Sequence, residues 1–317
     1  VADSAWANIE VRGKRREARA SGLEEERVEL AKKKAAYAAA GMLVPLPKDG
    51  VVIAGALTDE SGATHVTLSG NRVSGGGAGC TEAKGVLGSY VSVLFTDDAK
   101  GYLKKNSITA CAGVGLCIES GADPDAVGHD VSECSGAGVV VRSGGRGRLQ
   151  NNIVEDGDGV GVVVEAGGDP DARANTVRTN AMQGLLIESG AKGRFSANTV
   201  EHNGAAGVEL CGDCAPELRQ NHVRDNGGSG IVVAGASRAL LLENEISANG
   251  AEGVLLQSGA DAIFEKNQIC DNRCHGVVVG SGARGRLVRN RIERNGATGI
   301  TAVSDAAPCL RDNLVLQ

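Results

Sequence analysis

The sequence predicts an all-β fold: a parallel β-helix of about 11 rungs, preceded by an α-helical segment. One observation behind this prediction is a repeat of constant length that runs through most of the chain. A second is that Asn and Gly occupy fixed places in each repeat, between short aliphatic segments. Composition agrees, because 47 glycines and only 2% aromatic residues do not suit a conventional globular core.

The repeat is 23 residues long, and each unit opens with a polar residue, Asn in all but one case. The opening residues are Asn106, His129, Asn152, Asn175, Asn198, Asn221, Asn244, Asn267, Asn290 and Asn313. A Gly stands nine positions after each opening from Asn106 to Asn290, that is, from Gly115 to Gly299. A second Asn column follows the openings by five positions in the later units; it comprises Asn180, Asn203, Asn226, Asn249, Asn272 and Asn295.

Three short aliphatic segments divide each unit, as in "LVRNRIERNGATGI". Each segment would form one side of a three-sided coil, with like residues stacked about 4.8 Å apart. Asn suits the corners because it tolerates bent conformations and can bond the equivalent Asn one rung away. A leucine-rich repeat has a similar period but needs Leu where this chain has the opening Asn. The sequence therefore favours the β-helix, with the second Asn column as a structural ladder.

The regular repeat predicts two parts for the chain. Residues 1–47 are expected to form a helical cap or docking segment, because Ser21 and Glu24 make a capping box and Gly41 can end a helix. This helix would lie across the first rung, near Val51. Residues 48–317 are expected to form the β-helix. Its rungs are irregular over 48–105, with an insertion at 75–89, and regular over 106–317.

Charge and cysteine content narrow the class of protein. A net charge of −6 argues against nucleic acid as a partner, and no apolar run is long enough to span a membrane. The nine scattered cysteines indicate reduced thiols and hence a cytoplasmic location, in a cytoskeletal or other large assembly. Cys211 and Cys214 have the spacing of half a zinc site, but no second pair shares their column. We therefore expect no metal and no cofactor.

The pattern N-x-[IV]-x-x-N-x-x-x-G-[VI]-x-V-x-x-G resembles the right-handed parallel β-helix repeats of the carbohydrate-binding and sugar-hydrolase (CASH) type. Within these, it is most similar to the non-enzymatic β-helix module of F-box proteins, over about residues 50–317. The resemblance implies a right-handed, single-stranded coil with a pectate-lyase-like fold. It does not fix a function, because pectate lyases, polygalacturonases and alginate epimerases share this coil. Residues 1–50 contain no F-box pattern.

No catalytic residues are predicted. The carboxylates of Asp123, Asp125, Asp169 and Asp171 recur two rungs apart, and Arg146 and Arg148 occupy the same columns in the rung between. Alternating charges at rung spacing indicate an ion-pair ladder rather than an active site. The five histidines fall in different columns, and few aromatic rings are present to stack on sugars.

The residue between the two aliphatics of each Gly-Val-x-Val segment should point outward, yet it is mostly aliphatic. These positions form a predicted interaction stripe: Val140, Val163, Leu186, Val232, Leu255 and Val278. Contiguous exposed apolar surface usually marks an interface. The sequence thus favours a non-enzymatic scaffold that binds other proteins through this stripe, the N-terminal helix or the uncapped last rung. The alternative is a carbohydrate-active enzyme or a sugar-binding protein, although scarce aromatics disfavour a carbohydrate partner.

Overall fold

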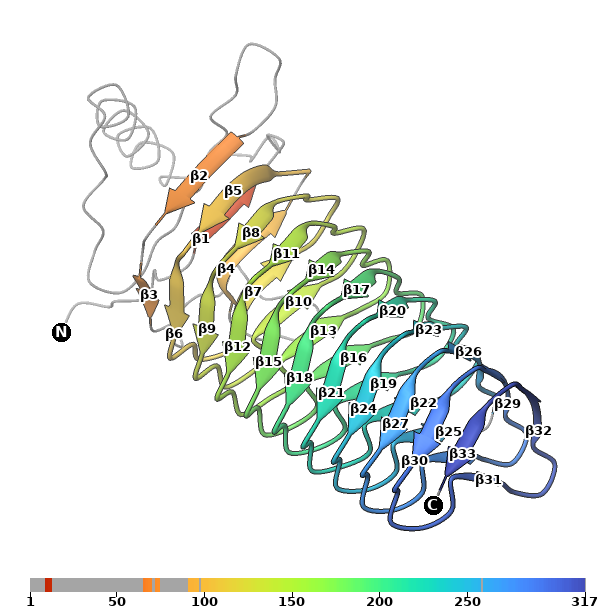
Figure 1. The fold of residues 1–317 in the computed structure, drawn as a ribbon. Coiled ribbons are helices and arrows are strands. Elements are labelled where there is room, and N and C mark those ends of the chain that lie inside the picture. Colours follow the sequence, from red (N-terminus) through yellow and green to blue (C-terminus); the bar gives the residue numbers. More distant parts are fainter. Residues whose placement is uncertain are drawn as a thin grey trace, which may run out of the picture.

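The computed structural model describes residues 9–12, 65–69, 72–74, 91–96, 98–257 and 259–316. These residues form a parallel β-solenoid in which three sheets of 11 strands each run along one axis (Figure 1). Successive rungs advance regularly from the first strands to the C-terminal end (Figure 1). The prediction of an all-β parallel β-helix is confirmed.

Sheet 1 contains β1 (Ile9–Arg12), β4 (Val91–Thr96), β7 (Val114–Ile118), β10 (Val139–Val141), β13 (Val162–Val164), β16 (Leu185–Ile187), β19 (Val208–Leu210), β22 (Ile231–Val233), β25 (Val254–Leu256), β28 (Val277–Val279) and β31 (Ile300–Ala302). Sheet 2 contains β2 (His65–Ser69), β5 (Lys100–Lys104), β8 (Asp125–Val127), β11 (Arg148–Gln150), β14 (Asp171–Arg173), β17 (Arg194–Ser196), β20 (Glu217–Arg219), β23 (Leu240–Leu242), β26 (Asp261–Glu265), β29 (Arg284–Val288) and β32 (Ala307–Arg311). Sheet 3 contains β3 (Arg72–Ser74), β6 (Ser107–Thr109), β9 (Asp130–Ser132), β12 (Ile153–Glu155), β15 (Thr176–Arg178), β18 (Thr199–Glu201), β21 (His222–Arg224), β24 (Glu245–Ser247), β27 (Gln268–Cys270), β30 (Arg291–Glu293) and β33 (Leu314–Leu316).

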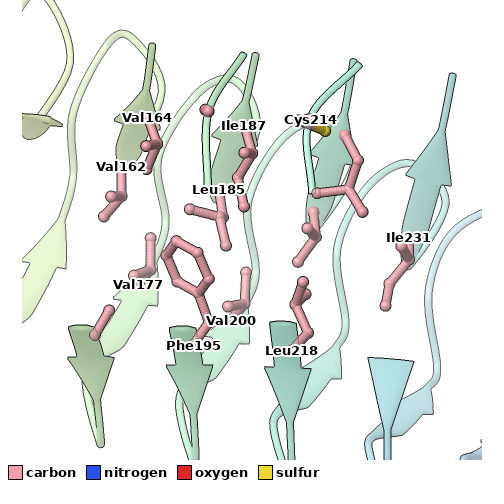
Figure 2. Packing of buried hydrophobic residues seen from close by; sticks show 14 of the residues in the cluster. Val162, Val164, Val177, Leu185, Ile187, Phe195, Val200, Cys214, Leu218 and Ile231 are labelled. Carbon is pink, nitrogen blue, oxygen red and sulfur yellow. The ribbon is translucent and has the colours of Figure 1, made fainter. Parts of the chain in front are cut away.

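The register follows the sequence repeat. Val140 lies beside Val163 in sheet 1, and Val154 lies beside Val177 in sheet 3. Each rung sends two side chains of sheet 1 and one each of sheets 2 and 3 into the interior, as Ile187, Phe195 and Val200 show in Figure 2. Because aliphatics stack on aliphatics from rung to rung, the core needs few aromatic rings.

The repeated Gly serves close packing rather than an unusual backbone angle. At Gly230, an added Cβ would collide with the Ile246 side chain and lie 2.7 Å from the Gly253 carbonyl oxygen. Left-handed backbone occurs instead at residues that precede the Asn columns, such as Glu243 (φ 55) and Ala248 (φ 53). The corner therefore combines a left-handed residue with the Asn that follows it.

The predicted N-terminal helical segment needs a correction. Residues 9–12 lie within it, but they form strand β1, which pairs in parallel with β4 and sets Ile9 beside Val93. The Ile-x-Val alternation of this stretch suits a strand, and the pairing satisfies one edge of β4. No helix occurs among the described residues. The predicted helix at 21–40, the stretch near Val51 and the insertion at 75–89 lie outside the described residues.

A candidate binding groove on sheet 1

The six asparagines of the predicted ladder lie in successive rungs and bond one another. Asn203 donates from Nδ2 to Asn226 Oδ1 at 3.0 Å, and Asn226 donates to Asn249 Oδ1 at 3.0 Å. The remaining steps follow the same pattern: Asn180 to Asn203, Asn249 to Asn272, and Asn272 to Asn295. These amides also donate to backbone carbonyls, so their hydrogen bonds serve to stabilise the corners.

The interaction stripe is not uniformly exposed, which corrects the expectation of one open face. Val140 and Val163 point away from the inner core but are only 3% and 8% exposed. They form a second apolar cluster with residues that include Leu94 and Cys117, and Leu186 packs partly buried against it. Further along, Val232, Leu255 and Val278 are half-buried. Periodicity gave the direction of these side chains but not their exposure.

A charged column runs beside this second cluster, at the ends of the sheet 1 strands. The Arg142 guanidinium donates from Nε to Glu119 Oε2 at 2.7 Å. Its Nη1 lies 3.6 Å from Glu165 Oε2, and only 7% of the Arg142 side chain is exposed. Glu188 follows in the next rung, where its backbone N–H donates to the Val164 carbonyl. The two carboxylates offset the cost of burying the Arg142 charge. With only one of the glutamates, part of the buried guanidinium would have no partner.

A partly open cavity of about 190 Å³ lies between the column and the cluster. We call it the sheet 1 groove. Its floor is formed by Cys117, Val140, Val163 and Leu186, and its wall by Arg142, Glu165 and Glu188. An apolar cavity with a few converging polar groups is the usual form of a ligand site.

Burial changes the acidity of two groups in this groove. It raises the pKa of Glu188, and the neighbouring charge of Glu165 adds to the effect. It also raises the pKa of the Cys117 thiol to about 12, so this thiol stays protonated at neutral pH. The wall thus contains two carboxyl groups in different environments, since Glu165 has Arg142 beside it and Glu188 does not.

Sequence reasoning missed Arg142, Glu165 and Glu188. A signal was present, because all three stand directly after the last aliphatic of a Gly-Val-x-Val-type segment, in one column. The predicted ion-pair ladder on sheet 2 is confirmed at one step, where Arg148 Nε lies 3.1 Å from Asp125 Oδ1. In the described part of the chain, no three His, Cys, Asp or Glu side chains gather closely enough to hold a metal ion.

The comparison with protein families identifies the class. A model of the right-handed β-helix region matches residues 54–215 and again residues 175–315. The chain therefore belongs to the right-handed β-helix family, as the solenoid of three parallel sheets indicates.

Solved structures support the same fold. The periplasmic alginate epimerase AlgG superimposes with a TM-score of 0.64 at 16% identity, covering 71% of this chain and 62% of the epimerase. A mutant of this epimerase gives 0.66 at 15% identity, with 81% and 71% coverage. At these identities the similarity shows the fold alone, and this chain spans less than two thirds of the first epimerase.

A search of curated proteins found no match to the sequence. None of the described residues forms a helix that could cross a membrane.

Proposed function

We propose that this chain is a carbohydrate-active β-helix protein that binds a glycan in the sheet 1 groove. The observation that carries this proposal is the wall of Arg142, Glu165 and Glu188 beside an apolar cavity on the outside of the coil. The Glu165 and Glu188 carboxylates offer acceptors to which sugar hydroxyls can donate, and Arg142 holds Glu165 in place. The fold shared with an alginate epimerase agrees with this function. We therefore place the carbohydrate function ahead of the protein scaffold that the sequence favoured.

The two carboxyl groups of the wall also suit acid–base chemistry. Glu165 and Glu188 occupy adjacent rungs, so their backbones are about 4.8 Å apart. The pKa of Glu188 is raised, so it keeps a proton to higher pH than an ordinary glutamate. Glycosidases use two carboxyl groups of different acidity, which the Glu165–Glu188 pair would supply here.

Binding of the purified chain to an array of anionic, neutral and cationic oligosaccharides tests the proposal. We expect at least one class to bind and Glu165→Gln to weaken that binding about tenfold, the scale of one lost charged hydrogen bond. Arg142 keeps Glu119 in this variant, so the fold should persist. Glu217→Gln on sheet 2 is the matched control. If no oligosaccharide binds, or if Glu165→Gln binds as the parent does, the proposal fails.

A protein-interaction scaffold is the second candidate function. It is favoured by the half-buried aliphatics Val232, Leu255 and Val278 on the later rungs of sheet 1. They continue the stripe beyond the groove, where an extended partner segment could lie. Under this second proposal, the chain would resemble the β-helix modules of F-box proteins in function and would act in the cytoplasm. Replacing Val232 and Val278 by Glu would abolish capture of such a partner. Unchanged capture would show that the stripe is not the interface.

A further inference from the structure

The second Asn column changes its chemistry in the first regular rungs. It carries Asn from Asn180 to Asn295, but Cys111 and Cys134 hold the same place in two successive earlier rungs. Among the described residues, these are the only two cysteines that share a column. A thiol is a weak hydrogen-bonding group. The corner at these two rungs therefore cannot form the amide bonds that join the later ones.

The two cysteines are neighbours in space. The strands that precede them pair in register, with Thr109 beside Ser132. Directly after Cys134, the Ser135 backbone N–H donates to the Cys111 carbonyl oxygen at 2.9 Å. Adjacent strands of a sheet lie about 4.8 Å apart, and the α-carbons of a disulfide lie about 4.4–6.8 Å apart. The spacing of the rungs thus permits a bond between the two sulfurs.

The two thiols share a hydrogen bond at this corner. This hydrogen bond lowers the pKa of Cys111, although burial opposes the change. The same hydrogen bond, together with burial, raises the pKa of Cys134. Cys111 is therefore the thiol that ionises first, which suits the attacking sulfur of a dithiol pair. Both thiols are free in the structure but only 2% and 1% exposed, so a reagent reaches them when the corner opens locally.

We propose that Cys111 and Cys134 are a redox pair that closes into a disulfide and stabilises the first two regular rungs. This inference is independent of the carbohydrate function. It replaces, for this pair alone, the expectation of reduced thiols.

The oxidant is a low-molecular-weight or protein disulfide, RSSR. The Cys111 thiolate attacks one sulfur of RSSR, which gives a mixed disulfide and releases RS⁻, and this anion takes up the proton that Cys111 lost. The Cys134 sulfur then attacks the Cys111 sulfur, and the second RS⁻ leaves and takes up the Cys134 proton. The two protein thiols lose two electrons in total, and RSSR is reduced to two RSH.

The disulfide would take the place of the missing Asn ladder. It closes a loop one rung long, which restricts the unfolded chain. It also joins two rungs that are otherwise held by contacts with their neighbours, so local opening at this corner becomes rarer. In reducing surroundings the pair stays as two thiols. The stability of these rungs would therefore follow the redox state of the surroundings.

Mass spectrometry of the full chain tests the pair. The protein is incubated with oxidised or with reduced glutathione, in low urea so that local opening is frequent, and the remaining thiols are alkylated. Cleavage after Glu119 and Glu133 places Cys111 and Cys134 on separate peptides. We expect disulfide-joined peptides after oxidation and two alkylated peptides after reduction. If both thiols are still alkylated after oxidation, or if glutathione stays bound to Cys111, the inference is wrong.

Variants locate the bond and measure its effect. Cys111→Ala and Cys134→Ala should each abolish the joined peptides, whereas Cys117→Ala, at a buried thiol in another column, is the matched control and should retain them. Oxidation should raise the melting temperature of the parent and of the control by several degrees, but not that of the two variants. Joined peptides that persist without Cys111, or a parent melting temperature that oxidation leaves unchanged, would overturn the inference. The measurements on the parent decide the question even where a variant does not fold.

Discussion

Asn226 links three rungs of the coil through its side chain. Its Nδ2 donates to the Val200 and Arg224 carbonyls and to Asn249 Oδ1, each at 3.0 Å. Its Oδ1 accepts from Asn203, at the backbone N and at Nδ2. Only an amide offers both donors and an acceptor in this geometry, which explains why the residue recurs at the corner.

Replacing Asn226 by Leu should therefore destabilise the fold. The leucine has the same branching at Cγ as asparagine, but it leaves buried carbonyl and N–H groups without partners, a loss on the order of 1–3 kcal/mol. Chemical denaturation of parent and variant measures the difference. Gln268→Leu, which changes an exposed amide on β27, is the control and should have little effect. Equal stability of Asn226→Leu and the parent would show that the ladder does not hold the corner.

His129 occupies the first Asn column with a different chemistry. Its Nδ1 accepts a hydrogen bond from the Asn106 backbone N–H at 3.1 Å, and the backbone N–H of His129 donates to Asn152 Oδ1 at 2.8 Å. Burial lowers the pKa of the imidazole below its ordinary value. Since Nδ1 must be unprotonated to accept this bond, the folded protein holds His129 neutral.

Stability should therefore fall as the pH is lowered below about 6.5, because the unfolded chain then binds a proton that folded His129 does not. Above that pH, the two states hold the same charge at this residue and no loss occurs. His129→Asn restores the repeat and should flatten this part of the pH dependence. Denaturation of both proteins at about pH 5 and pH 7.5 measures it. His222→Asn is the control, because it removes an exposed histidine, which pairs with Glu245. We expect this variant to keep the loss of stability that His129 causes at low pH. An equal loss at low pH in His129→Asn and the parent would contradict the prediction.

At the scale of the strands, the sequence predicted what the repeat determines. Sheet register followed because like residues stack, so Leu149 lies beside Ala172 and Val177 beside Val200. Strand β1 escaped prediction for a physical reason. It pairs with β4, and 84 positions separate Ile9 from Val93, so no periodic signal connects the two. Local propensity alone could not choose between helix and strand there.

The sheet 1 groove could not be predicted from the sequence for a similar reason. Periodicity told which side chains of sheet 1 point outward, and Val140 does point away from the inner core. It could not tell that Val140 would be buried, because burial depends on which side chains pack around it, here Leu94 and Cys117 among others. The charged column was visible in the sequence only as single residues, Arg142 among them. Stacked rungs turn such residues into neighbours.

At the scale of the whole molecule, each rung contacts mainly the rungs before and after it. The three sheets repeat with the same offset, so any two regular rungs present nearly the same upper and lower surfaces. The inward aliphatics and the packed Gly recur at each one, and from Asn175 onward both Asn columns recur as well. The solenoid should consequently tolerate the loss of one complete rung, but not the loss of part of one.

Deleting residues 221–243 removes one 23-residue unit and brings Asn198 against Asn244. The new junction also sets Val200 beside Ile246 and Leu210 beside Leu256, so each inward column stays aliphatic. We expect a folded, cooperative protein whose far-UV circular dichroism per residue equals that of the parent, with a modestly lower melting temperature. Deleting residues 221–232 instead would shift the columns and place polar residues in the core, so this shorter deletion should unfold the chain. If the 23-residue deletion unfolds it as well, the rungs are not interchangeable, and stability depends on contacts particular to that rung.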